Sequence, residues 1–193
     1  MSGAGACDEE TKTGQQKSRV PMEEEGGRAR GPIATYLVED HRQLDGLLER
    51  AVADPDRVDR ESYDRFRAGL LRHIGMEEKI LLPAIQRWRG GSPWPMAPKL
   101  RLDHGAIASL LMPTPTASVI GTLRDILAEH NGVEEGPEGL YATGDELAGA
   151  EAEQILARLQ AAPDVTVMPH SDTEAVIHTV RRAVEKAGYR FKE

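Results

Sequence analysis

The sequence predicts an all-α fold, and three observations support this prediction. Apolar side chains recur every three or four positions in successive segments, a spacing that lines one face of a helix. Clusters of proline and glycine, as at 90–95 and 113–115, separate these segments. Histidines and glutamates recur twice in the same order on the apolar faces, which indicates an internal duplication. Helices with such faces must pack together around a common core.

The first two expected helices are long. Pro32 suits a first helical turn, so the first helix is expected to run from there to about Val52. Asp59 is a good N-cap, and the second helix is expected to run from it to about Arg89. Pro83 lies inside this second helix and is expected to produce a local kink.

Two further helices complete the predicted core. A shorter third helix is expected over about 98–112, before the Pro-Thr-Pro run. The fourth is expected over about 116–135, where a Gly-Pro step at 136–137 interrupts it. In both pairs of helices, the first helix carries a histidine and the second carries a histidine and a glutamate. The second pair therefore repeats the first.

The C-terminal part is expected to add two more helices. One is predicted over about 145–160, where it covers the bundle. Ser171 and Glu174 form a capping box for a last, amphipathic helix that Gly188 closes. The N-terminal segment has too little apolar content to offset the entropy of ordering. The expected organisation is a disordered leader over 1–30, a bundle over 31–161 and a C-terminal extension over 162–193.

Two matched sets of acidic residues and histidines carry the chemistry. In each set an aspartate-histidine pair comes first, and a later histidine is followed by a glutamate four residues on. A residue four positions along a helix lies one turn up the same face, so each later pair can point to one spot. The candidate ligands are His41, His73 and Glu77 in the first set and His104, His130 and Glu134 in the second.

All six candidate ligands lie on apolar faces that must be buried. A buried carboxylate loses its hydration and needs protons, hydrogen-bond donors or a cation. Four imidazoles and two carboxylates divide evenly over two six-coordinate metal ions, with two imidazoles on each ion and both glutamates bridging. The sequence therefore leads to the hypothesis of a dinuclear iron site, while a helix bundle whose histidines bind zinc or manganese, or no metal, is an alternative.

The order histidine, histidine-x3-glutamate, histidine, histidine-x3-glutamate resembles the hemerythrin-like cation-binding domains, also called HHE domains. The resemblance runs over about 31–161, and the stretch His73–Pro83 is similar to the family's second-helix signature. It implies an up-and-down four-helix bundle, to which the C-terminal helices are added. It also implies two iron ions inside the bundle, in a non-haem di-iron centre with an oxo or hydroxo bridge. The ligands that it implies are His41, His73, His104 and His130, with Glu77 and Glu134 as bridging carboxylates.

The sequence departs from the oxygen-carrying hemerythrins at two positions. Those proteins place a further histidine four residues after the one on the third helix, where this chain has Ala108. They also have an aspartate five residues after the last histidine, where this chain has Glu135. With two histidines for each metal, each iron could keep an open or water-filled position.

Several neighbouring residues have more than one possible role. Four acidic residues lie next to ligands in the sequence: Asp40, Glu78, Asp103 and Glu135. Each is turned about 100° away from its neighbouring ligand, so solvent exposure is favoured. One or two of them could instead accept a hydrogen bond from the ring N–H of a ligand histidine. Tyr141 lies seven residues after Glu134 and is a candidate pocket residue, but a packing role is favoured because the Gly-Pro step intervenes. His170 and His178 have no glutamate partner and are expected at the surface or in packing.

Composition and charge exclude several classes of partner. The formal charge is −8 and the sequence has no concentrated basic face, so neither nucleic acid nor an anionic membrane is expected as a partner. The single cysteine, Cys7, allows no intramolecular disulfide. Since no apolar run of membrane-spanning length and no signal peptide are evident, the expected location is the cytoplasm.

The expected function is that of a di-iron protein that binds or senses oxygen, nitric oxide or peroxide, or that handles iron. A competing hypothesis is a di-iron enzyme that activates oxygen or decomposes peroxide. Binding is favoured because the sequence has no glycine-rich nucleotide loop, nucleophile set or recognisable reductase domain. The expected partner is a small diatomic gas or peroxide.

Overall fold

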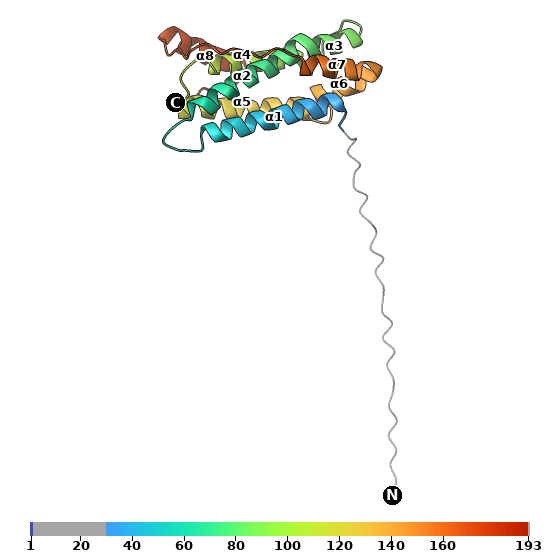
Figure 1. The fold of residues 1–193 in the computed structure, drawn as a ribbon, viewed down its shortest axis with the longest axis horizontal. Helices are drawn as coiled ribbons and strands as arrows, with labels where there is room; N and C mark the ends of the chain where they lie inside the picture. Colours follow the sequence, from blue (N-terminus) through green and yellow to red (C-terminus); the bar gives the residue numbers. More distant parts are fainter. Residues whose placement is uncertain (2–29, 193) are drawn as a thin grey trace.

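The computed structural model describes Met1 and residues 30–192 (Figure 1). The predicted leader, including Cys7, lies outside the described residues apart from its first and last positions. The predicted all-α fold is confirmed, because every regular element within the described residues is a helix or a helical turn. No helix in this part of the chain is long and apolar enough to cross a membrane.

Four helices form the bundle, and their bounds lie within a few residues of those predicted except at the end of the second helix. They are α1 (Pro32–Ala51), α2 (Arg60–Met76), α4 (Ala97–Leu110) and α5 (Ala117–Glu135). The Asp59 side chain accepts a hydrogen bond from the Glu61 N–H at 3.1 Å, as expected for the N-cap of α2. Thr116 caps α5 in the same way, through the Val119 N–H at 3.2 Å.

The second helix continues beyond Met76, but not as a plain α-helix with a kink at the proline. A π-helical turn, η1 (Glu77–Leu81), joins α2 to α3 (Leu82–Trp88). The Leu82 N–H donates to the Glu77 carbonyl five residues back. Pro83 lacks an N–H and crowds the carbonyl four residues before it, and the wider turn accommodates this conflict. The irregular backbone therefore begins at Glu77, a candidate ligand.

The prediction of a single helix over 145–160 is wrong in two respects. The helix begins earlier, as α6 (Leu140–Ala148), and it is broken by a 3-10 turn, η2 (Gly149–Glu151), before α7 (Ala152–Gln160). Gly149 has φ +49°, a conformation that favours glycine and ends α6. In Figure 1, α6 and α7 lie beside α3 at one end of the bundle.

The last helix, α8 (Glu174–Lys186), packs along α4 toward the other end of the bundle (Figure 1). Its N-cap is Thr173, whose hydroxyl accepts from the Val176 N–H at 3.4 Å, rather than the predicted Ser171. Gly188 has φ +95° and ends the helix, as predicted.

The apolar core consists of two clusters. The α8-side cluster includes Leu48, Phe66, Ile107, Leu123 and Val184. The α6–α7-side cluster includes Ile33, Leu81, Leu100, Leu140 and Ile155. Along α1 and α4, and along α2 with η1, the buried apolar residues before and after the ligand histidine belong to different clusters, and those of α5 belong to the α8-side cluster. The candidate ligands thus form a buried polar layer between two apolar regions.

A carboxylate from α6 caps the first helix. Helix α1 has no side-chain cap from its own N-terminal residues. The Asp145 oxygens instead accept the N–H groups of Ile33 at 2.9 Å and Ala34 at 3.1 Å. These bonds satisfy N–H groups that a helix terminus leaves free, and they tie α6 to the start of the bundle.

We expect Asp145→Ala to lower the free energy of unfolding by about 1 kcal/mol, the typical cost of a lost helix cap. Urea denaturation would measure the change. Glu146→Ala is the matched control, because Glu146 is exposed on the same helix, and it should change stability by less than about 0.5 kcal/mol. Equal effects of the two substitutions would contradict the capping role.

Candidate metal centre

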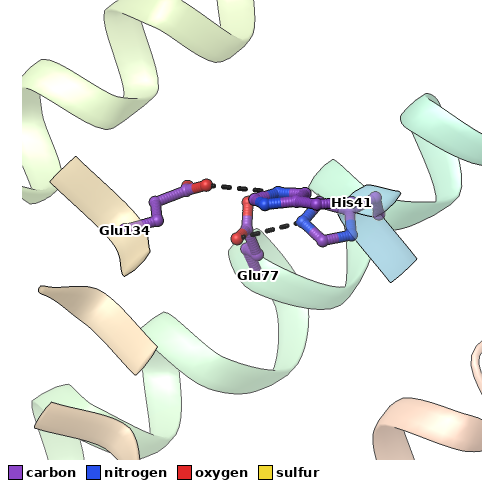
Figure 2. A group of neighbouring side chains, drawn as sticks. His41, Glu77 and Glu134 are labelled. Carbon is purple, nitrogen blue, oxygen red and sulfur yellow. Dashed lines mark ion pairs between the residues drawn. The ribbon is translucent and has the colours of Figure 1, made fainter. Parts of the chain in front are cut away.

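The structure brings all six predicted ligands into one buried layer. His41 comes from α1, His73 from α2 and Glu77 from the start of η1. The other three are His104 on α4 and His130 and Glu134 on α5. None of the six is more than 5% exposed. Figure 2 shows His41, Glu77 and Glu134 pointing toward one another from separate segments.

The first metal set consists of His41, His73, Glu77 and Glu134, whose donor atoms all lie within 4.8 Å of one another. His73 Nε2 lies 3.3 Å from Glu77 Oε1. His41 Nε2 lies 3.5 Å from Glu134 Oε2. The set thus presents two imidazole nitrogens and one oxygen from each glutamate.

The second metal set consists of His104, His130 and the same two glutamates. His104 Nε2 lies 3.1 Å from Glu77 Oε2, and His130 Nε2 lies 3.1 Å from Glu134 Oε1. Each glutamate therefore directs one oxygen to the first set and its other oxygen to the second. This is the arrangement that a carboxylate needs to bridge two cations.

The other ring nitrogen of each histidine faces a carboxylate from a neighbouring helix. The Nδ1 distances are 2.8 Å from His41 to Glu135, 2.7 Å from His73 to Asp40, 2.7 Å from His104 to Glu78 and 3.7 Å from His130 to Asp103. Solvent exposure was the favoured expectation for these four acidic residues, whereas Asp103 is buried and the other three are only partly exposed. A carboxylate at Nδ1 holds a ring proton there, which leaves Nε2 as the nitrogen that can bind a metal.

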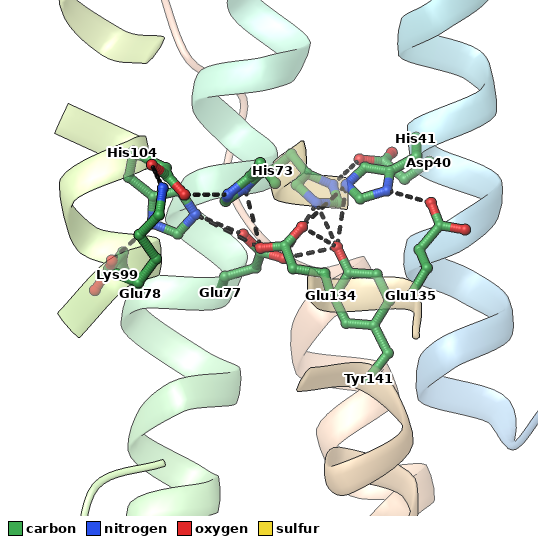
Figure 3. Close-up of polar contacts among 12 residues, drawn as sticks. Asp40, His41, His73, Glu77, Glu78, Lys99, His104, Glu134, Glu135 and Tyr141 are labelled. Carbon is green, nitrogen blue, oxygen red and sulfur yellow. Dashed lines mark hydrogen bonds and ion pairs between the residues drawn. The ribbon is translucent and has the colours of Figure 1, made fainter. Parts of the chain in front are cut away.

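These outer carboxylates link the four helices in a circular order, and Figure 3 shows three of them, Asp40, Glu78 and Glu135, beside the centre. Glu135 on α5 contacts the ligand histidine of α1, and Asp40 on α1 contacts that of α2. Glu78 on η1 contacts the ligand histidine of α4, and Asp103 on α4 faces that of α5. In each case the acid follows or precedes a ligand on its own helix. One short stretch of each helix thus supplies a ligand to the centre and a support for the next helix.

The fourth of these links differs from the other three. Asp103 lies 2.5 Å from Lys99 Nζ, which also lies 2.9 Å from the hydroxyl of Tyr189, beyond α8. Its remaining oxygen and His130 Nδ1 both lack a hydrogen-bond partner among the described residues. Asp103 is therefore shared with a lysine, and the second set is less tightly held at His130.

Tyr141 is a site residue that the sequence analysis did not favour. Its ring packs in the α6–α7-side cluster, but its hydroxyl ends in the first set (Figure 3). The hydroxyl oxygen lies 2.7 Å from Glu77 Oε1 and 3.1 Å from Glu134 Oε2. It also lies 3.1 Å from His41 Nε2 and 3.0 Å from His73 Nε2. Its position seven residues after Glu134 was the only signal in the sequence.

The remaining two histidines stay outside the centre. His170 Nδ1 lies 2.8 Å from the Pro113 carbonyl, and its ring stacks on Tyr63. His178 is exposed on α8. Both placements agree with the expectation that these histidines serve packing or lie at the surface.

Charge in the centre is balanced by protons when no metal is present. Burial by itself lowers the pKa of His73, but the charge of Glu77 and the contact with Asp40 outweigh it and raise that pKa to about 10. At His104 and His130 facing carboxylates likewise outweigh burial and raise the pKa to about 11 and about 9. Burial would raise the pKa of Glu77, yet the histidines hold it well below its usual range. A metal ion must therefore displace protons from these imidazoles.

The comparison with protein families gives one match. A family model described as "Hemerythrin HHE cation binding domain" matches residues 33–160, which include all six candidate ligands and Tyr141. No curated protein and no solved structure matches the chain significantly.

The raised histidine pKa values predict how stability depends on pH. The stabilisation from a protonated histidine is fully present below its unfolded pKa, near 6.5, and is lost as the pH rises through the folded value. We therefore expect the melting temperature of the metal-free protein to fall as the pH rises from about 6.5 to about 11, the highest of the three raised values. Thermal denaturation together with NMR titration of the imidazole C–H signals would measure this change.

The metal-loaded protein is the control for this titration. Its imidazoles have already lost the competing protons, so its melting temperature should not follow the same histidine titration. A metal-free protein whose imidazole signals titrate near pH 6.5 would contradict the electrostatic account.

Proposed function

Because the chain belongs to the hemerythrin HHE cation-binding family, we propose that it holds two non-haem iron ions and uses them to bind or sense a small ligand such as dioxygen, nitric oxide or peroxide. His41 and His73 would hold one ion, and His104 and His130 the other. Glu77 and Glu134 would bridge the two.

One observation carries the proposal of two metals. Glu77 and Glu134 are fully buried, and each directs its two oxygens to different pairs of histidines. Glu77 Oε2, Glu134 Oε1 and His104 Nε2, all donors of the second set, lack a hydrogen-bond partner within the described part of the chain. Buried polar atoms without partners are costly, and a cation between them would remove that cost.

The donor types agree with iron. Imidazole and carboxylate groups suit iron and other divalent first-row metals, and the described residues add no thiolate to the centre that would favour a softer ion. The choice of iron rests on the family. When bound, a pair of iron ions supplies adjacent redox-active Lewis acids with coordination positions for a small ligand.

The protein's own residues set the surroundings of such a pair. The outer carboxylates orient the imidazoles, and the two apolar clusters keep bulk water away from the layer between them. Ligands that are at most 5% exposed favour a resident metal pair over iron held loosely for transfer. A buried, apolar-flanked centre also favours a small and uncharged molecule over a large or polar substrate.

Metal analysis together with absorption spectroscopy tests this proposal. Protein purified without air should contain two iron ions per chain, and its spectrum should change on exposure to air or nitric oxide. Zinc or manganese in place of iron, or fewer than one iron per chain after loading with ferrous salt, would refute it. Steady consumption of oxygen or peroxide with a reductant present would assign the centre to catalysis instead of ligand binding.

The bridging role predicts unequal effects of ligand substitutions. Glu77→Ala and Glu134→Ala should each reduce iron from two ions per chain to near zero, because each carboxylate serves both ions. His41→Ala should leave about one ion per chain, since His41 belongs to the first set only. Metal analysis of refolded, desalted protein would measure these contents.

Glu138→Ala is the matched control for the bridging test. Glu138 is an exposed glutamate close to Glu134 in the sequence, and its loss should leave both ions in place. Similar losses of iron from the three ligand variants would contradict shared carboxylates.

A further inference from the structure

We propose that the phenol oxygen of Tyr141 is a fifth protein ligand to the metal held by His41 and His73, which leaves the second metal as the one that binds small molecules. This inference rests on the proposed metal-binding function. It assigns different roles to two ions whose histidine and glutamate ligands are related by the internal duplication.

The position of the phenol oxygen supports this role. It lies between 2.7 and 3.1 Å from all four donor atoms of the first set. In a six-coordinate site with bonds of about 2.1 Å, neighbouring donors are about 3 Å apart. The phenol oxygen therefore lies where a ligand adjacent to the other four would lie.

Hydrogen bonds alone could not satisfy these atoms in the protonation state that binds metal. In that state the ring protons of His41 and His73 lie on Nδ1, toward the outer carboxylates, and both Nε2 atoms are acceptors. The two glutamate oxygens are acceptors as well. A single hydroxyl has one proton and can donate to only one of these four atoms. A cation among the four and the phenol oxygen would satisfy all of them at once.

No tyrosine hydroxyl among the described residues occupies the equivalent position at the second set. The residue seven positions after Glu77, the counterpart of Glu134, is Ala84. Donors of this set instead lack hydrogen-bond partners in the described residues, as noted above for His104 Nε2. The second metal would thus have four protein donors where the first has five.

A tight turn delivers Tyr141 to the first set. After α5 ends, Gly139 passes so close to the preceding turn that a Cβ there would lie 2.4 Å from the Glu134 carbonyl oxygen. Helix α6 starts at the next residue, and Tyr141 is its second residue. The same backbone that carries the bridging Glu134 therefore fixes where the phenol lies.

Coordination would also change the protonation of the phenol. A cation favours the deprotonated form of a group that coordinates it, so the phenolic proton would pass to solvent when the metal binds. The resulting phenolate adds one negative charge next to the first metal only.

Resonance Raman and absorption spectroscopy of the ferric-loaded protein test this assignment. We expect a visible phenolate-to-iron charge-transfer band and enhanced tyrosine ring vibrations that shift when the tyrosine rings are deuterated. Tyr141→Phe should abolish both signals while two iron ions remain bound. Tyr63→Phe is the matched control, because Tyr63 is buried and its hydroxyl has no partner in the described residues; both signals should persist.

Nitric oxide binding to the ferrous protein gives a second readout. Wild-type protein should bind one nitric oxide per chain, at the second metal, and Tyr141→Phe should bind two. Two irons without tyrosine vibrations, or the same nitric oxide ratio in both proteins, would overturn the assignment and leave the proposed function intact. A chain that binds no iron would overturn both proposals, and metal analysis separates these cases.

Discussion

Two glutamates buried between apolar clusters are the constraint on which this structure depends. Glu77 and Glu134 have no access to water, and each directs its oxygens to two different groups of histidines. A carboxylate in such surroundings is stable only beside positive charge. Protons on the imidazoles can supply that charge, and metal ions can supply it without excess protons. The four bundle helices are arranged so that either form of compensation is available.

The duplication explains how a small number of residues meets this constraint. Each helix segment pairs a central ligand with an outer carboxylate that reaches the next helix, and four such links close into a ring. The ring orients the imidazoles and also joins the helices, so the metal centre and the bundle share the same contacts. The copies differ at two points: Tyr141 enters the first set, and Lys99 shares Asp103 beside the second. These differences would make two similar metal positions chemically unequal.

The features that depend on regular helical spacing could be predicted from the sequence. The ligand helices and the convergence of His73 with Glu77 follow from residues one turn apart on an apolar face. Features that depend on breaks in that spacing were predicted less well. Tyr141 follows a Gly-Pro step, and the π turn at Glu77 reflects a local conflict with Pro83. The outer carboxylates could equally have faced solvent, because an offset of about 100° does not say how close the next helix lies.

Anomalous diffraction at the iron absorption edge, on crystals of the iron-loaded protein, tests the central claim most directly. The account predicts two separate anomalous peaks, one beside His41 and His73 and the other beside His104 and His130, with both glutamates in contact with each. A single peak, or peaks away from Glu77 and Glu134, would contradict the claim that paired cations neutralise the buried carboxylates.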